Sequence, residues 1–182
     1  MKSEWQRITL GKICRFQAGN AFPRKEQGKV SGDIPFIKVS DMNLSGNERK
    51  IYKSNNWIST NYAKQTKINL APPGAIVFAK IGEAIKANRL RELTRHTAID
   101  NNMMAAIPNS NIEDGFLRYI LENINLAHYA EGSALPYLRQ KDLEAIYITL
   151  PSRNEQKCIV NTIQKLDSKI EINNRINDNL AT

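Results

Sequence analysis

Cysteine, histidine and long apolar runs are all scarce in this sequence of 182 residues. The two cysteines, Cys14 and Cys158, are far apart and belong to no CxxC pair. We therefore expect no structural zinc site, and a reducing compartment fits. No segment approaches the roughly 20 apolar residues of a membrane span, and residues 1–10 lack the apolar core of a secretory signal. These features predict a cytoplasmic protein that makes no membrane contact.

Catalytic motifs are lacking as well. The segment "LAPPGAIVF" looks superficially like the Asn/Asp-Pro-Pro-aromatic loop of amino-methyltransferases, but Ala71 and Gly74 stand at its two chemical positions. The segment "KIGEAIKANR" does not have the spacing of a phosphate-binding P-loop. His96 and His128 are isolated from other candidate ligands and are expected to be surface or packing residues. We expect no catalytic residue, no bound metal and no cofactor.

Basic residues outnumber acidic ones, and the excess is confined to the first part of the chain. Residues 1–100 hold 18 Lys/Arg and 8 Asp/Glu, a net charge of +10, whereas residues 101–182 hold 8 and 10, a net charge of −2. A basic block of this kind is typical of a protein that binds a polyanion, most commonly nucleic acid. The alternative is a generally basic surface with no such partner.

The apolar pattern predicts a mixed α+β domain over residues 1–151. Ranges 34–40, 72–82 and 103–107 have the character of short strands, and alternation at Ile146, Ile148 and Leu150 predicts another before Pro151. A helix is predicted from the capping-box spacing of Ser110 and Glu113, with a buried face at Phe116, Leu117, Ile120, Leu121 and Ile124. Three polar stretches are expected to be irregular, functional loops: Asn20–Asp33, Asp41–Lys67 and Gly82–Thr97.

Residues 152–182 are predicted to form a separate long helix. Ser152 and Glu155 have capping-box spacing, so the helix should begin at about Arg153. Steps of four and three residues then mark the seam of a helix that packs along its length: Ile159, Ile163, Leu166, Ile170, Asn173, Asn177 and Leu180. Such a helix would be about 40 Å long, so we expect part of the seam to pair with another helix as a coiled coil. Folding back onto its own domain is the alternative.

The segment "GSALPYLRQKDLEAIYITLPSRNEQKCIVNTIQKLDSKI" resembles the end of a target-recognition domain in type I restriction-modification specificity (S) subunits. The residues that carry the resemblance are Gly132, Ser133, Pro136, Leu138, Leu143, Ile146, Pro151, Glu155, Gln156, Ile159, Leu166 and Asp167. The opening "EWQRITLGKICRFQAG" is similar to the start of such domains through Trp5, Leu10, Gly11 and Ile13. The segments "GDIPFIKVSDM" and "GAIVFAKIG" look like internal strands of the family.

The resemblance implies a non-catalytic protein that reads DNA. Family members carry two such domains, each followed by a helix, and the paired helices space two halves of a split DNA site. Modification (adenine methyltransferase) and restriction (ATP-dependent translocase and nuclease) subunits assemble on them. This sequence has one domain and one helix, which implies either a half-subunit that pairs with itself or a fragment of a longer subunit.

A DNA reader needs Lys and Arg for phosphates and Arg, Asn or Gln for base edges. We rank three groups of candidates. The first is Lys86, Asn88, Arg89, Arg91 and Arg95; the second is Lys80 with Arg24, Lys25 and Lys29; the third is Tyr137, Arg139 and Lys141. Two other classes of function remain as alternatives: a stand-alone DNA nuclease, and an assembly protein that acts only through its helix.

Overall fold

The central sheet has five strands in the order β2-β10-β7-β8-β4. The computed structural model describes residues 5–180, except for the side chains at positions 171, 174, 175 and 178–180. Neighbouring strands are antiparallel, apart from the parallel pair β4–β8. Their bounds are β2 Cys14–Ala18, β4 Lys50–Ile51, β7 Ile76–Ala79, β8 Arg91–Leu93 and β10 Met103–Pro108. The strands predicted within 72–82 and 103–107 are thus confirmed as β7 and β10.

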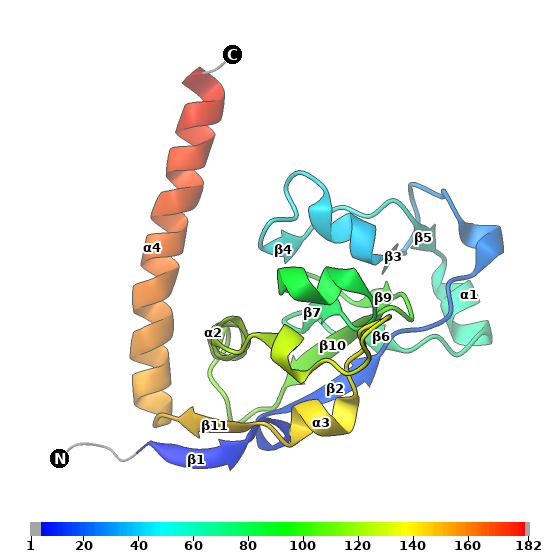
Figure 1. The fold of residues 1–182 in the computed structure, drawn as a ribbon. Coiled ribbons are helices and arrows are strands. Elements are labelled where there is room, and N and C mark those ends of the chain that lie inside the picture. Colours follow the sequence, from blue (N-terminus) through cyan, green and yellow to red (C-terminus); the bar gives the residue numbers. More distant parts are fainter. Residues whose placement is uncertain (1–4, 181–182) are drawn as a thin grey trace.

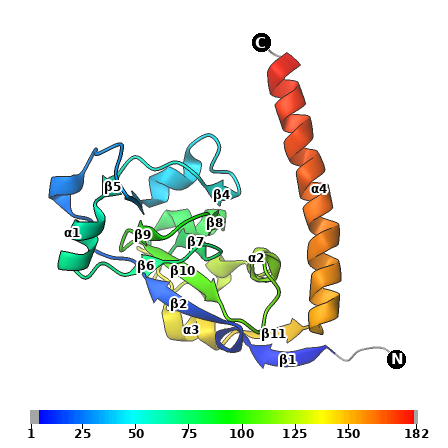
Figure 2. The same cartoon turned by 180° about the vertical axis from the view of Figure 1, so that it is seen from behind.

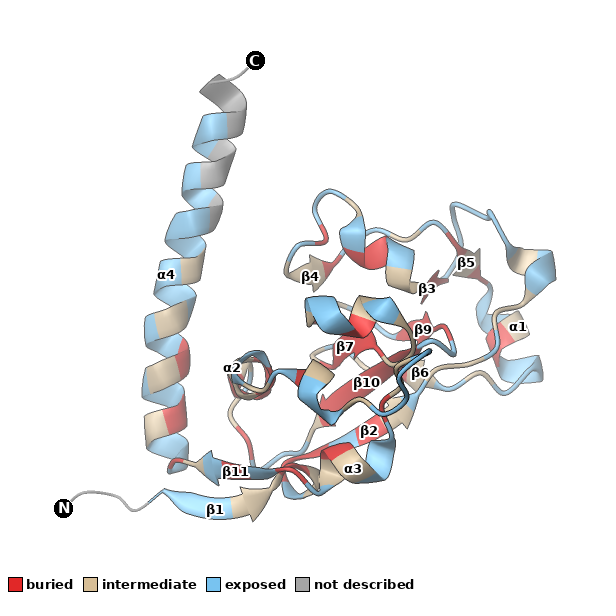
Figure 3. Cartoon of the chain, viewed as in Figure 1, coloured by how far each residue is buried: buried red, intermediate tan, exposed pale blue. Residues whose placement is uncertain are grey.

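Both faces of this sheet are buried, which explains why β7 and β10 are apolar without alternation. Ile76 and Phe78 point into the main core, together with Phe16 and Leu117. Val77, between them on β7, points into a second core on the other face. Figure 3 shows the resulting concentration of buried residues in the sheet.

A second sheet has the order β5-β3-β9-β6, formed by β5 Trp57–Ile58, β3 Ile34–Ile37, β9 Thr97–Ile99 and β6 Leu70–Ala71. The strand predicted over residues 34–40 is confirmed only as far as Ile37. A 3-10 helix, η3 (Val39–Asn43), follows it because the Asp41 carboxylate accepts the backbone N–H of Lys38 at 2.7 Å and turns the chain.

The three stretches expected to be irregular contain short regular elements, so that part of the prediction was wrong. They hold the 3-10 helices η2 (Arg24–Glu26) and η4 (Glu83–Ala87), the helix α1 (Thr60–Gln65), and the strands β4, β5 and β8. These elements are two to six residues long, and their polar outer surfaces hide the apolar periodicity on which the prediction depended.

The helix α2 (Phe116–Asn123) begins later than its capping-box spacing predicts. Gly115 is the N-cap, at φ +81°. The Ser110 carbonyl and the Glu113 carboxylate instead accept hydrogen bonds from Arg153, at 2.8 and 3.3 Å. The predicted buried face is confirmed at Phe116, Leu117 and Leu121, while Ile120 and Ile124 are partly buried against the main core.

A two-stranded ribbon of β1 (Gln6–Thr9) and β11 (Tyr147–Leu150) joins the first described residues to the base of the last helix. The remaining short elements are η1 (Leu10–Lys12), η5 (Leu126–Tyr129) and α3 (Gln140–Glu144). The strand predicted before Pro151 is confirmed as β11, in which the Ile148 side chain is buried.

The last helix, α4, spans Arg153–Leu180 and begins where the sequence predicts. Its capping box forms: the Glu155 carboxylate accepts the Ser152 N–H at 3.0 Å, and the Ser152 hydroxyl accepts the Glu155 N–H at 3.4 Å. Figure 1 shows α4 rising from the β1–β11 ribbon, with α2 between it and the sheet, and Figure 2 shows the same arrangement from behind. Its C-terminal end extends beyond the rest of the chain (Figures 1 and 2).

Candidate nucleic-acid interface and helix surface

The segment after β7 and the segment around Tyr137 lie side by side. The Lys80 carbonyl accepts the Leu138 N–H at 2.9 Å, and the Gly82 N–H donates to the Pro136 carbonyl at 2.7 Å. Lys80 also donates its backbone N–H to Asn102 at 2.7 Å. Lys80 is thereby brought next to the third group of candidates, more than fifty positions later in the sequence.

A tight loop presents the third group. Glu131 and Tyr137 exchange two backbone hydrogen bonds of 2.9 Å, and Gly132 turns the chain at φ +87°. The Arg139 guanidinium donates to the Tyr137 hydroxyl at 2.7 Å and pairs with the Glu131 carboxylate at 2.6 Å. Arg139 is exposed but has a carboxylate partner, whereas Lys141 is exposed on α3.

Two members of the first group use their polar atoms inside the chain. Asn88, in the left-handed conformation at φ +43°, donates to the Ile124 carbonyl at 3.4 Å and accepts the Leu126 N–H at 3.3 Å. Arg91 donates to the Met42 carbonyl at 3.2 Å, and burial lowers its pKa. These contacts join neighbouring segments, and they leave Lys86, Arg89 and Arg95 as the exposed members of this group. Of these, Lys86 pairs with Glu83 at 2.7 Å.

The other members of the second group, on and after η2, lie at the end of the domain that is remote from α4 (Figures 1 and 2). Arg24 and Lys25 are exposed on η2, and Lys29 pairs with Glu26 at 2.6 Å. Arg95 is on this side as well, since its guanidinium carbon is 5.9 Å from the centre of the Trp57 ring. The candidates therefore divide between two regions, one around Lys80 and one around η2.

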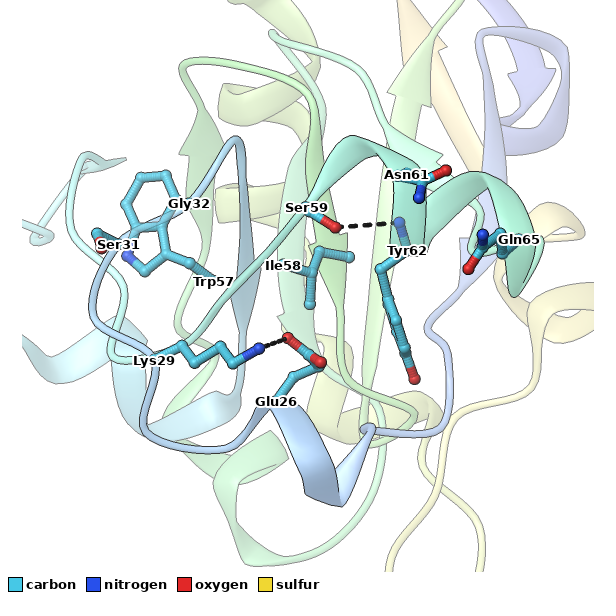
Figure 4. Close-up of a pocket in the computed structure, with 10 residues that line it drawn as sticks. All are labelled: Glu26, Lys29, Ser31, Gly32, Trp57, Ile58, Ser59, Asn61, Tyr62 and Gln65. Atoms are coloured by element: carbon cyan, nitrogen blue, oxygen red, sulfur yellow. Dashed lines mark hydrogen bonds and ion pairs between the residues drawn. The ribbon is translucent and has the colours of Figure 1, made fainter.

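A cavity of about 310 Å³ opens beside η2 (Figure 4). Trp57 and Tyr62 supply its aromatic walls, and the Glu26–Lys29 pair lies at its edge. Sequence reasoning missed this cavity because its lining comes from two segments that are about thirty positions apart. The full lining is Glu26, Lys29, Ser31, Gly32, Trp57, Ile58, Ser59, Asn61, Tyr62 and Gln65.

The predicted helix seam divides into an inner and an outer part. Ile159 packs against the main core and Ile163 is partly buried, so the first turns of α4 do pack on the chain's own domain. Leu166 and Ile170 are 57% and 58% exposed. Asn173 and Asn177 are exposed too, whereas the Leu180 side chain lies outside the described residues.

Two more apolar side chains on α4 were missed by the sequence reasoning. Ile172 and Ile176 are 55% and 49% exposed. At 100° per residue, Ile172 lies about 120° around the helix from Leu166. The i, i+4 spacing of this second pair is its only sequence signal, and a single heptad seam does not include it.

Among the described residues, no three His, Cys, Asp or Glu side chains form a group that could hold a metal ion. In the same part of the chain, no helix has both the length and the apolar character that crossing a membrane requires.

The fold, an α+β domain with a long helix that leaves it, is that of type I specificity domains. Residues 2–182 match the family described as "Type I restriction modification DNA specificity domain", and the chain belongs to this family. The resemblance seen in the sequence is thereby confirmed. The family's description names a DNA specificity domain, and the curated relative is named a specificity subunit of a restriction enzyme.

Known relatives agree with this assignment. The chain is 29% identical over 178 residues to the type I restriction enzyme MjaIX specificity subunit of Methanocaldococcus jannaschii, covering 94% of this chain and 39% of that protein. Its fold is similar to the HsdS subunit from Thermoanaerobacter tengcongensis (TM-score 0.67, 18% identity, 94% of this chain and 39% of that chain). It is also similar to a chain solved in work on complex assembly and conformational transition of the type I R-M system, with a TM-score of 0.74 and 18% identity. That match covers 96% of this chain and 41% of the other. The chain spans about two fifths of the length of these relatives.

Proposed function

We propose that residues 1–151 form a target-recognition domain that binds one half of a bipartite DNA site, and that residues 152–182 form a spacer helix. The observation that carries this proposal is the family match, which extends over the domain and the helix together. The net charge of +10 over residues 1–100 supports DNA as the partner.

The exposed basic side chains are the proposed DNA contacts. Arg24, Lys25, Arg89, Arg95 and Lys141 are all exposed. Lys80, Lys29, Lys86, Tyr137 and Arg139 belong to the same two regions, and the last four would have to exchange an internal partner for a phosphate or a base. Asn88 and Arg91 act, in this proposal, by holding the loops that carry the others.

The helix is proposed to pair with a second helix of the same kind, either from another copy of the chain or from a second domain in a longer subunit. Exposed Leu166 and Ile170 are the side chains that such pairing would bury. If two copies pair, the recognised DNA would be a split palindrome. Modification and restriction subunits would assemble on this scaffold, and the complex would act in the cytoplasm.

The proposal is tested by light scattering and DNA binding with the purified chain and its modification subunit. We expect a complex that contains both proteins and binds duplex DNA with an affinity that falls steeply with salt. Arg89→Ala and Lys25→Ala should each flatten the salt dependence by about one unit, whereas Arg91→Ala should affect mainly folding stability. If the two proteins do not associate and the chain has no DNA affinity, the proposal is wrong. Metal-dependent cleavage of DNA by the chain alone would favour the nuclease alternative.

A further inference from the structure

Asp167 connects α4 to two other parts of the domain. One carboxylate oxygen, Oδ1, forms an ion pair with the Arg49 guanidinium, and the other, Oδ2, accepts a hydrogen bond from the Tyr119 hydroxyl at 3.2 Å. The hydrogen bond from Arg49 is the main reason that the pKa of Asp167 is lowered, so the carboxylate is ionised over the neutral range. Tyr119 is on α2, and Arg49 immediately precedes β4.

The backbone of Arg49 is fixed from two sides. Its carbonyl oxygen accepts the Glu92 N–H of β8 at 2.9 Å and a guanidinium N–H of Arg118 at 2.8 Å. Arg118 is itself 8% exposed and pairs with Glu122 at 2.7 Å. Arg49 therefore reaches α4 from an anchored position on the edge of the central sheet.

The loop before Arg49 is rigid for a separate reason. Asn47 is fully buried, and its amide donates to the carbonyls of Asp41 and Lys53 at 2.8 and 2.9 Å. Its side-chain oxygen accepts the N–H groups of Tyr52 and Lys53 at 2.9 and 3.1 Å. Buried polar groups satisfied in this way hold one conformation, so the loop keeps Arg49 in a fixed position.

Asp167 lies far from the base of α4, so its contact with Arg49 affects the tilt of the whole helix. Arg153, bonded to Glu113 and Ser110, and Gln156, bonded to the backbone of Glu113, attach the helix at its first turn. At 1.5 Å per residue, Asp167 is about 21 Å further along. Beyond it, every described α4 side chain, at positions 168–170, 172, 173, 176 and 177, is exposed. A tilt of about 10° at the base would move the far end of the helix by about 7 Å, or two base pairs of DNA.

We propose that Arg49 and Asp167 are positioning residues that set the angle between α4 and the recognition domain, and that this angle specifies the distance between the two halves of the DNA site. The consequence for DNA spacing rests on the function proposed above. The consequence for the helix angle does not, so the two can fail separately.

The helix angle is tested by pulsed electron spin resonance on the whole chain. Spin labels are placed at Lys12→Cys and Asn173→Cys in a Cys158→Ser background, and labelled chain is diluted with unlabelled chain so that only distances within one chain are measured. Cys14 is buried, and burial raises its pKa to about 12, so it stays unlabelled. We expect one narrow distance distribution, which Asp167→Asn and Arg49→Gln broaden or shift by about 5 Å.

Matched variants separate positioning from stability. Arg153→Gln removes the ion pair at the pivot and should leave the distance unchanged, even if it lowers stability to a similar extent. The exchange Arg49→Asp with Asp167→Arg should restore the narrow distribution by re-forming the pair in the opposite direction. An unchanged distribution in both single variants, with the fold intact, would overturn the proposal.

The spacing is tested with the assembled methyltransferase complex on DNA in which the length between half-sites is varied. Asp167→Asn should keep the sequence of each half-site but accept lengths one or two base pairs away from that preferred by the wild type. An altered helix angle with unchanged spacing would overturn the link to DNA. If the wild-type complex has no bipartite site at all, the proposed function fails while the result on the helix angle stands.

Discussion

Gln156 Oε1 accepts a hydrogen bond from the backbone N–H of Glu113 at 3.0 Å. The same side chain, 2% exposed, donates to the Pro151 carbonyl at 2.9 Å. It therefore ties the base of α4 to the segment that leads into α2 and to the end of β11. Adjacent Glu155 has a different task, since it caps the helix. The Glu-Gln pair of the C-terminal motif thus combines a cap with an internal bracket.

Replacing Gln156 with Ala should lower the free energy of unfolding by about 2–3 kcal/mol, because the buried bond to the Pro151 carbonyl and the part-buried bond to the Glu113 N–H are both lost. Urea unfolding followed by circular dichroism measures the change. Asn161→Ala, at an exposed position of the same helix, is the control and should change stability by less than about 0.5 kcal/mol. Equal effects of the two substitutions would show that the bracket contributes nothing.

Gly132→Ala should destabilise the loop that carries Tyr137 and Arg139. A Cβ at position 132 would lie 2.8 Å from the Leu135 carbonyl oxygen, in addition to the strain of φ +87°. Gly28→Ala is a matched control, because φ is +79° there and nothing lies within 4 Å of the added atom. The control should lose about 1 kcal/mol and Gly132→Ala clearly more. Equal losses in a thermal melt would mean that the loop moves aside at no cost.

The two cysteines should react at very different rates. Cys158 is exposed, whereas burial raises the pKa of Cys14 to about 12, with a smaller contribution from Glu144. Only the thiolate is nucleophilic, so at pH 8 a thiol reagent should modify one cysteine quickly and the other only as the chain unfolds. Mass spectrometry over time counts the reagent groups attached to the chain, and simultaneous modification of both cysteines would contradict the burial of Cys14.

Burial of Cys14 also makes stability depend on pH. Because the folded-state pKa is raised, burial of Cys14 favours folding below the unfolded value of 9.0, and this contribution falls as the pH rises from there towards about 12.

Leu166→Asp and Ile170→Asp should weaken association of the helix with its partner at least tenfold while leaving the domain folded. Both side chains are more than half exposed in the single chain, so their replacement costs the domain little, whereas a carboxylate buried in a helix pair lacks a partner. Ser168→Asp, exposed and on nearly the opposite side of the helix, is the control. Sedimentation at several concentrations measures the effect, and unchanged association in both variants would place the partner on another face. Ile172→Asp then tests the second apolar pair.

Sequence periodicity predicted the parts of the fold in which one pattern dominates. β7 and β10 are apolar on both faces, and α4 combines a proline stop, a capping box and a regular stripe, so local and tertiary preferences agree there. The start of α2 was predicted wrongly because Glu113, which has capping-box spacing, forms an ion pair with Arg153 of α4 instead of capping α2. No local pattern carries that information.

The candidate site was predictable in composition but not in geometry. A run such as 86–95 marks a basic segment, yet only the fold separates Arg91, which bonds to Met42, from exposed Arg89. The Arg49–Asp167 pair joins residues 118 positions apart, and although Asp167 belongs to the C-terminal motif, nothing in the sequence indicates that Arg49 is its partner. Long-range contacts of this kind become visible only when the chain is folded.

The most direct test of half-site recognition is selection and sequencing of DNA by the complex. The purified chain is assembled with its modification subunit, incubated with a randomised duplex pool and S-adenosylmethionine, and the methylated adenines are mapped. We expect two short half-sites at a fixed separation, either the same motif twice or two different motifs. The half-site sequence should be changed or lost when Arg89 and Lys25 are replaced together. Methylation without sequence preference, or a single continuous motif with no gap, would contradict the account.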